Sequence, residues 1–568
     1  MVNERKKLGD MKKKAIIEYL LVIITILLMT SILLAFQVRN EAWLPGADGP
    51  FHSSRIYDAA QQIRYGNFSY FQMNYGGSQT GRIINAVYGP FFTYFLGGIL
   101  LLAGTWFKFQ ILLDYLIFLV GGIGMYTFAK KAGASKWASL LGMLLFLITG
   151  YMGYWPIGST FYSWGAALMP YVLMQGLKMI QNESDQINWL SLGGLMGLIG
   201  QIHLLSIIFS TLILIPFFIY GWIISKERKK LVFNLIKAIV LFMLLTANLW
   251  GAFLVLYPTN HMTPTHSYLL DVATLHIGNT ARTYMVSRLV LYVIVLQLIY
   301  ALWNRKKSRI NTFITLEGCG FLLITSPFLP WKAMGNIFPF LSSTLQFPHR
   351  FSALAYPLIF AGVALSLTNL EKGKSFEKAI GIGGILLVIG AIGFNLRNEV
   401  RVVKQESLYF NQTSPQLEKW SRAKDLAKLI DNLPILNSEY LPMYKKIDAL
   451  QISQLVNDDI YHNKTTYHKK VLSNGRLELN WQAKKSNTEQ LLPIFIYSQS
   501  HLVVNGKINQ IKRFNQIGMP YVKNKIGNNI AILSFQTPIW FNFLLIISIL
   551  SWIGIIILLI FKKAKKLL

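Results

Sequence analysis

Long hydrophobic runs separated by short basic segments set the pattern of this chain. The first run, 15–36, follows a start rich in lysine and arginine. It is long enough to cross a bilayer as a helix and longer than the apolar region of a signal peptide. The pattern therefore predicts a retained first transmembrane helix with its N-terminus on the cytoplasmic side.

Further runs of the same kind predict about twelve transmembrane helices in all, and hence an all-α polytopic membrane protein. The other predicted spans lie near 109–129, 137–153, 163–180, 188–203, 204–224, 233–255, 286–303, 311–328, 352–369, 379–395 and 539–561. The run 88–105 is short and is interrupted by Pro90, Gly97 and Gly98. We expect it to be an interfacial or re-entrant segment.

Basic residues mark one side of the predicted bundle. If the spans alternate, the dense clusters that begin at Lys130, Lys226, Arg305, Lys372 and Lys562 all fall on the side of the N-terminus. The positive-inside rule then puts both termini in the cytoplasm and the protein in the cell membrane. The segments left outside are 37–108, 257–284, 327–351 and 396–538.

Composition agrees with the membrane class. The 568 residues are 53% hydrophobic and 14% charged, with a net charge of +30. The positive charge is explained by topology signals and by contacts with anionic lipid headgroups, so membrane lipids are the expected partners and nucleic acid is not. The single cysteine, Cys319, excludes an internal disulfide framework and a cysteine metal cluster.

The segment 396–538 reads as a separate unit. Its first half is polar and amphipathic, whereas "GRLELNWQA" and "NNIAILSF" in its second half alternate like strands, and "VNGK" is typical of a hairpin turn. We expect a small extracytoplasmic α+β or β-sandwich domain. The predicted division is a membrane domain, 1–395, with the outer loop 37–108, then the domain 396–538, and then a last helix with a basic tail, 539–568.

The first outer segment contains candidate chemistry in "LPGADGPFHSSRIYDAAQQIRYGNF". A helix from about residue 51 would place His52 and Arg55 on one side, just after Asp48. Each residue also has an ordinary interpretation. Asp48 suits a turn or a helix N-cap, His52 a loop, and Arg55 an anchor for lipid phosphate.

An acid directly after the first membrane helix, followed by H-x-x-R and an amphipathic helix that closes in G-x-F, resembles the first external loop of GT-C glycosyltransferases. These multi-spanning enzymes use polyprenyl-phosphate sugars. The segments "YGPFFTYFLGGILLL" and "GMYTFAKKAGASKWASLLGMLLFLITGY" extend the resemblance. "LQFPHRF" and "LLPIFIYSQSHLVVNGK" look closer to the bacterial YfhO-like branch, which includes proteins labelled 6-pyruvoyl-tetrahydropterin-synthase-related. The pterin label has no support here, because no histidine triad has zinc-site spacing.

The resemblance implies a role for each matching residue. Asp48 would be the catalytic base that takes a proton from the acceptor hydroxyl. The donor would be a polyprenyl-phosphate-linked sugar, and the acceptor an envelope glycan or lipid. Candidates for binding the substrate and its lipid phosphate are His52, Arg55, Lys332, His349 and Arg350. For Lys332 and Arg350, interfacial snorkelling is the alternative.

The next external loop, "GYWPIGSTFYSWG", contains no acid. Some GT-C branches hold a metal with acids in that loop, so neither a divalent metal nor another cofactor is implied here. The aromatic residues of this loop are most simply an interfacial belt; a platform for stacking a sugar is the alternative.

Two other functions stay open. Glu18, Asp114 and Glu317 lie in or at the edges of apolar runs, and intramembrane acids often serve transport. A lipid or polysaccharide transporter or flippase is therefore the second hypothesis. A non-catalytic scaffold for envelope assembly is the third.

Overall fold

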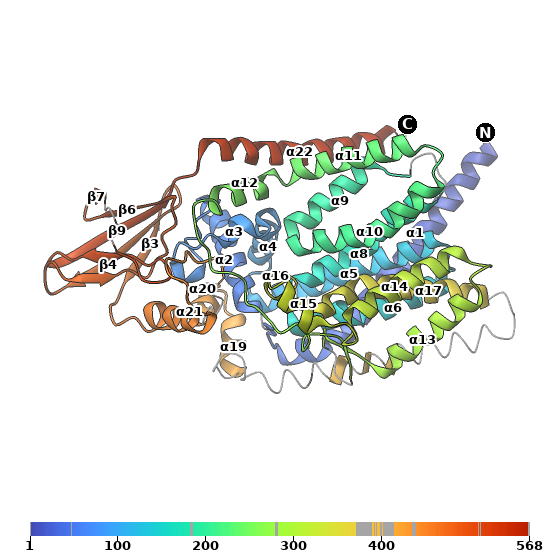
Figure 1. The fold of residues 1–568 in the computed structure, drawn as a ribbon, viewed down its shortest axis with the longest axis horizontal. Helices are drawn as coiled ribbons and strands as arrows, with labels where there is room; N and C mark the ends of the chain where they lie inside the picture. Colours follow the sequence, from blue (N-terminus) through green and yellow to red (C-terminus); the bar gives the residue numbers. More distant parts are fainter. Residues whose placement is uncertain are drawn as a thin grey trace.

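A long helical bundle with a small sheet at one end forms the architecture of this computed structural model (Figure 1). Both chain termini lie at the end of the bundle opposite to the sheet. The structure describes residues 2–46, 48–181, 186–278, 282–370, 389–390, 392–393, 395–397, 400, 414–433, 439–508, 511 and 513–565.

The predicted spans correspond to helices. The bundle contains α1 (Val2–Asn40), α5 (Trp106–Ala132), α6 (Lys136–Leu147), α7 (Gly150–Gly158), α8 (Tyr162–Ile180), α9 (Trp189–Ile202), α10 (Leu204–Ile224), α11 (Arg228–Leu245), α12 (Ala247–Leu256), α13 (Arg288–Trp303), α14 (Arg309–Thr325), α17 (Ser352–Leu370) and α22 (Ile539–Lys565).

The number of described helices that are long and apolar enough to cross a membrane is smaller than the number of spans that the sequence predicts. Five described helices are long and apolar enough to cross a membrane, or up to seven if each of two bent pairs is one span. The bent pairs are α6 with α7, at 46°, and α11 with α12, at 60°. Most of the predicted span 379–395 lies outside the described residues. The number of about twelve therefore stays a prediction.

The first outer segment folds into short helices on the side of the bundle toward the sheet (Figure 1). These are α2 (Gly49–Tyr65), the 3-10 turn η1 (Gly77–Gln79), α3 (Ile84–Val87) and α4 (Pro90–Ala103). The 14 residues of α4 are fewer than a span needs. This helix packs against α2 at Gly97, where a Cβ would lie 2.8 Å from the backbone nitrogen of Ala60.

The segment that the sequence predicts to lie outside contains helices and a small sheet, and we refer to it as the outer domain for that prediction. Its main sheet has five antiparallel strands in the order β3-β4-β9-β6-β7, and a separate two-stranded ladder pairs β5 with β8. The strands are β3 (His468–Leu472), β4 (Arg476–Ala483), β5 (Glu489–Leu491), β6 (Ser500–Val504), β7 (Lys507–Ile508), β8 (Tyr521–Lys523) and β9 (Gly527–Phe535). Its helical elements are α19 (Ser414–Ser421), α20 (Ala427–Asn432), α21 (Ala449–Val456) and the π-helix η4 (Asn457–Tyr461).

Two further connections join the bundle helices. The one between α12 and α13 contains the two-residue strands β1 (His276–Ile277) and β2 (Met285–Val286), and the one between α14 and α17 contains α15 (Trp331–Ile337), α16 (Phe340–Thr344) and the 3-10 turn η2 (Pro348–Phe351). β1 and β2 pair in parallel.

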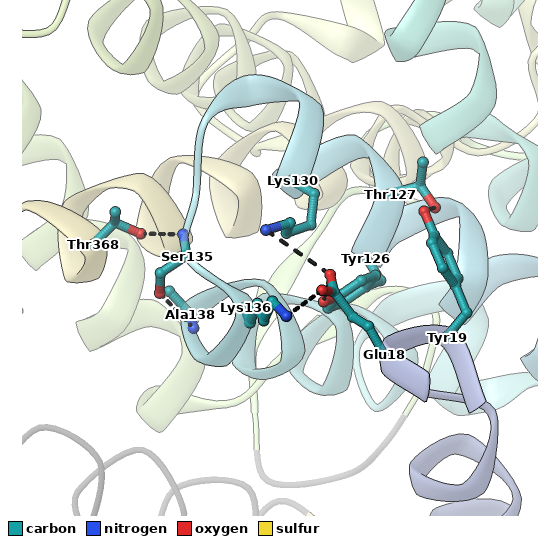
Figure 2. A network of polar contacts seen from close by, with 9 residues as sticks. All are labelled: Glu18, Tyr19, Tyr126, Thr127, Lys130, Ser135, Lys136, Ala138 and Thr368. Atoms are coloured by element: carbon teal, nitrogen blue, oxygen red, sulfur yellow. Dashed lines mark hydrogen bonds and ion pairs between the residues drawn. The ribbon is translucent and has the colours of Figure 1, made fainter. Parts of the chain in front are cut away.

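Contacts at the other end of the bundle hold the first helix (Figure 2). The Glu18 carboxylate of α1 lies 2.5 Å from the Lys136 ammonium and 3.9 Å from that of Lys130, and it accepts a 2.6 Å hydrogen bond from the hydroxyl of Tyr126. Lys130 lies in the last turn of α5, and Lys136 is the first residue of α6. Glu18 thus serves to fix α1 on its neighbours.

Candidate functional site

The loop that carries Asp48 is held against the bundle by its backbone. The side-chain amide of Gln110 on α5 accepts a hydrogen bond from the Leu44 nitrogen at 2.9 Å and donates one to the Leu44 carbonyl at 2.5 Å. Gly46 has φ +61°, and a Cβ there would lie 2.1 Å from the carbonyl oxygen of Gly158. A glycine is needed for this close approach, which brings the loop beside the end of α7.

Asp48 occupies the N-cap position of α2 without acting as a cap. Its side chain makes no capping hydrogen bond, whereas its backbone carbonyl accepts one from the His52 nitrogen at 3.1 Å. The carboxylate is accessible. It interacts with the hydroxyl of Thr160 and with the positive charge of Arg350. The N-cap interpretation of this side chain is therefore wrong.

The surroundings of Asp48 favour a protonatable carboxyl. The side chain has solvent-accessible surface, and protein atoms nevertheless lie around it densely enough to desolvate the carboxyl. This burial raises the pKa of Asp48, and the charge of Arg350 and the Thr160 hydroxyl oppose the rise. A carboxylate with a raised pKa is a stronger base once it is ionised.

His52 and Arg55 contact each other on one face of α2. The distance from His52 Nδ1 to Arg55 Nη1 is 3.1 Å. The imidazole stacks on the ring of Phe161 with 3.7 Å between centroids, and burial lowers its pKa well below the usual range. His52 is therefore a neutral, stacked histidine.

Arg55 is 1% exposed and is surrounded by neutral acceptors. Its Nε donates to Asn85 at 3.1 Å, and its Nη2 donates to Thr93 at 2.8 Å and to the Tyr88 carbonyl. Burial lowers its pKa to about 10, so the guanidinium remains charged at neutral pH. Most of its donors are already used, and the role expected for it in phosphate binding stays a prediction.

His349 and Arg350 lie together in η2. The His349 imidazole is buried, with Nδ1 2.9 Å from the Ala273 carbonyl and Nε2 3.2 Å from the Thr283 hydroxyl. Arg350 is half-buried and donates to the Leu345 carbonyl at 2.7 Å and to Gln346 at 3.0 Å. Because the Arg350 charge acts on Asp48, η2 and the first loop contribute to one site.

Lys332 lies apart from these contacts. It is exposed on α15 and makes no hydrogen bond or ion pair with any residue that the structure describes. This position is compatible with the snorkelling alternative and with a role in attracting lipid phosphate, so its predicted role is untested.

Glu439 is a site residue that the sequence did not suggest. Its carboxyl is half-buried, its Oε1 accepts a 3.4 Å hydrogen bond from the His266 nitrogen, and its charge interacts with those of Asp48 and Arg350. Burial raises the pKa of Glu439 as well. The connection between α20 and α21 in the outer domain thus brings a second carboxylate to the site.

The backbone around Glu439 is held on both sides. Its carbonyl accepts from Nη2 of Arg82 at 2.8 Å, and the Tyr440 carbonyl accepts from the Tyr497 hydroxyl at 3.0 Å. The Thr263 nitrogen donates to the Leu441 carbonyl at 2.8 Å, and the Leu441 nitrogen donates to the Thr263 hydroxyl at 2.9 Å. Tyr440 has φ +61°, a left-handed conformation that is rare for a bulky residue. Such strain persists only where surrounding contacts impose it, and it often marks functional sites.

The aromatic-belt interpretation of the loop 153–165 is wrong for most of its rings. Trp155, Phe161, Tyr162 and Trp164 are each 2–3% exposed and pack inside the bundle. Phe161 stacks on His52, and the Tyr162 hydroxyl donates to the Arg350 carbonyl at 2.8 Å, so these two rings lie at the site rather than in a surface belt.

Two acids remain inside the bundle. Asp114 of α5 is 1% exposed, and both carboxyl oxygens of Glu317 on α14 are buried without a hydrogen-bond partner among the described residues. Over the described part of the chain, no group of three or more His, Cys, Asp or Glu residues could hold a metal ion.

Comparisons with known proteins find distant likeness to solved structures alone. No family model matches the chain, and no curated protein matches it. The solved structures that the chain is similar to include the crystal structure of ArnT from Cupriavidus metallidurans bound to undecaprenyl phosphate, with 14% identity and a TM-score of 0.39. The match covers 72% of this chain and 76% of that one. At this identity and TM-score, no residue role transfers from that protein.

Proposed function

We propose that this protein is a membrane glycosyltransferase of the GT-C type, in the branch that the YfhO-like proteins represent. It moves a sugar from a polyprenyl phosphate to an envelope polymer or lipid at the outer face. The observation that carries the proposal is the placement of Asp48, an accessible carboxylate that caps no helix and that interacts with the charge of Arg350. The motif around Asp48, with His52 and Arg55, supports it.

In the proposed reaction, Asp48 removes the proton from an acceptor hydroxyl as that oxygen attacks the anomeric carbon. The bond between this carbon and the phosphate oxygen breaks, and the lipid phosphate leaves with the electron pair. Arg350 stabilises the negative charge of the leaving group. A fixed cation stabilises such developing charge most strongly in a site that is shielded from water. Glu439 orients the acceptor by accepting hydrogen bonds from its other hydroxyls.

The remaining predicted residues support this arrangement. His349 contributes a neutral imidazole beside Arg350, and Arg55 holds His52 and adds a positive charge behind the site. Lys332 attracts the lipid phosphate from the membrane surface. No step requires a divalent metal, so chelation of metals should leave the transfer rate unchanged.

The test is Asp48→Asn in protein reconstituted with a polyprenyl-phosphate sugar. The amide keeps the shape of the side chain but cannot act as a base, so we expect transfer to fall by about 100- to 10,000-fold. Binding of the donor lipid should change little, because Asp48 acts on the acceptor. Asp458→Asn, on an exposed carboxylate of η4, is the matched control and should retain normal transfer.

Asp48→Asn together with a third variant, Asp114→Asn, separates the three hypotheses. A scaffold should be indifferent to Asp48→Asn, and a transporter should respond more strongly to Asp114→Asn, which changes the acid inside α5. Wild-type transfer by Asp48→Asn, with normal membrane insertion, would contradict the proposed function.

A further inference from the structure

Gln346, between α16 and η2, has a strained backbone four residues before Arg350. Its φ is +60°, in the left-handed region that residues with a side chain rarely adopt. Local hydrogen bonds impose the turn. The Gln346 and Leu345 nitrogens both donate to the Leu341 carbonyl at 3.0 Å. Strain of this kind persists where neighbouring contacts hold it, and it often accompanies function.

The side-chain amide of Gln346 is engaged at both of its ends. Its Oε1 accepts a 3.0 Å hydrogen bond from Nη2 of Arg350, and its Nε2 donates to the His266 carbonyl at 2.9 Å. A guanidinium can only donate and a carbonyl can only accept, so these two partners fix the orientation of the amide. The side chain at this position must therefore offer an acceptor and a donor at once, as a primary amide does.

Two acceptors and two aromatic rings hold the Arg350 guanidinium. Its Nη1 donates to the Leu345 carbonyl at 2.7 Å, beside the contact of Nη2 with Gln346. The guanidinium carbon lies 4.8 Å from the centroid of the Phe347 ring and 5.7 Å from that of Tyr162. The acceptors fix the direction of the fork, and the ring faces limit its tilt. Arg350 is thus restricted to a narrow set of orientations.

This restriction matters because two carboxylates act on Arg350 from other segments. The charge of Arg350 interacts with those of Asp48 and Glu439. Among the described residues, no ion pair joins Arg350 to Asp48. A guanidinium that moved freely would be drawn into a bidentate pair with such a carboxylate, and the two charges would then neutralise each other. The contacts that hold Arg350 keep its charge available for a third group.

The same amide connects Arg350 to the second acid. The His266 backbone accepts from Gln346 at its carbonyl and donates to Oε1 of Glu439 at its nitrogen, at 2.9 and 3.4 Å. One residue of backbone therefore separates the partner of Arg350 from the partner of Glu439. A change at position 346 is expected to act on the cation first, because the amide contacts it directly.

We propose that Gln346 is a positioning residue, which holds the Arg350 guanidinium apart from Asp48 and available for the phosphate of the donor lipid. The identity of that phosphate rests on the proposed function, whereas the hold of Gln346 on Arg350 does not. Gln346 acts through Arg350 and contacts no reacting atom. The strained turn at position 346 is then part of the site.

The experiment compares Gln346→Ala with Gln346→Gly in the full chain. Both remove the amide, but glycine also relieves the left-handed strain. Gln346→Gly should therefore have the higher midpoint of unfolding in detergent. The affinity for a short-chain polyprenyl phosphate, measured by titration calorimetry, should nevertheless fall equally in both, by about tenfold, as for the loss of a hydrogen bond to a charged group. If affinity instead follows stability, or stays at the wild-type value, the proposal is wrong.

Gln79 provides the matched control. It is also a left-handed glutamine, with φ +52°, but its side chain makes no hydrogen bond to any residue that the structure describes. Gln79→Ala and Gln79→Gly should repeat the difference in unfolding midpoint and leave the affinity for polyprenyl phosphate unchanged. An equal loss of affinity in these variants would show that strain in the outer loops, and not the amide of Gln346, governs binding.

A double-mutant cycle with Arg350→Met separates this role from the proposed function. Methionine removes the guanidinium and offers no hydrogen bond in its place, so Gln346→Ala should cause no further loss of affinity in that background. The cycle on unfolding midpoints needs no substrate and should be non-additive as well, because both substitutions remove the same hydrogen bond. Additive effects on unfolding would overturn the proposal. Non-additive unfolding with no binding of polyprenyl phosphate by the wild type would support the hold on Arg350 and refute the proposed function.

Discussion

At the scale of single residues, opposing influences set the protonation of Asp48. Enclosure by protein raises the pKa of its carboxyl, whereas the positive charge of Arg350 lowers it. Glu439 adds a like charge whose own pKa is raised. The charge of Arg350 thus helps to keep Asp48 ionised, and so able to act as a base, near neutral pH.

This balance predicts the pH dependence of transfer. A base is active only when it is deprotonated, so the rate should fall as pH drops through the pKa of Asp48. Arg350→Gln removes the charge that lowers this pKa, and the acidic limb of kcat/KM should move to higher pH. Arg350→Lys keeps the charge and should leave the limb near its original position. Profiles measured on both variants check the prediction, and coincident acidic limbs for Gln and Lys would contradict it.

Local sequence could reveal one half of the site and not the other. Asp48, His52 and Arg55 are close along the chain, so a motif shows them together, and His52 does contact Arg55. Glu439 reaches the same site through contacts with Arg82 and His266 from distant segments. Its own neighbourhood, "NSEY", contains no motif. Tertiary contacts alone bring it there.

At the scale of secondary-structure elements, the close contact between α2 and α4 positions the site motif. Helices approach this closely only where side chains are small, and α4 supplies Gly97 opposite Ala59 and Ala60. Gly98, the next residue, has nothing within 4 Å of the position its Cβ would take. The two adjacent glycines therefore form a matched pair for a test.

Gly97→Ala should destabilise the protein by about 1–3 kcal/mol, because its methyl group overpacks the contact with the α2 backbone. Gly98→Ala should be neutral or stabilising by about 0.5–1 kcal/mol, since alanine is the better helix former. Denaturant unfolding in detergent measures both. Equal effects of the two substitutions would show that α2 and α4 are not packed in this way.

Hydrophobic length predicted the long helices well and the bends poorly. The run 137–153 was expected as one span, yet α6 ends at Leu147 and α7 begins at Gly150, where φ is +58°. A bend of this kind depends on what packs beside it: a Cβ at Gly150 would lie 2.6 Å from the ring of Tyr356 on α17. Sequence periodicity contains no information about such a distant neighbour.

At the scale of the whole molecule, the outer domain and the first loop are joined by specific contacts. Phe71 of the loop stacks on Phe535 of β9 with 4.5 Å between ring centroids. The side-chain amide of Asn74 donates to the Gly475 carbonyl at 2.8 Å, and that of Asn67 donates to the Leu472 carbonyl at 2.9 Å. The loop that carries Asp48 and the sheet therefore belong to one end of the protein, which is a condition for a site that both parts complete.

This arrangement predicts which positions face the outside of an intact cell. In a Cys319→Ala background, single cysteines at Arg64, exposed at the end of α2, and at Ser473, exposed beside β3, should react with a membrane-impermeant thiol reagent. A cysteine at Lys306, exposed in the basic turn between α13 and α14, should react only after the membrane is opened. The positive-inside rule gives this orientation, because the turn carries four basic residues within 305–309.

Labelling of the cysteine at position 306 in intact cells, with protection of those at 64 and 473, would reverse the topology and move Asp48 away from the outer face. Labelling of Arg64 without Ser473 would instead separate the first loop from the outer domain, contrary to the contacts of Asn74 and Phe71.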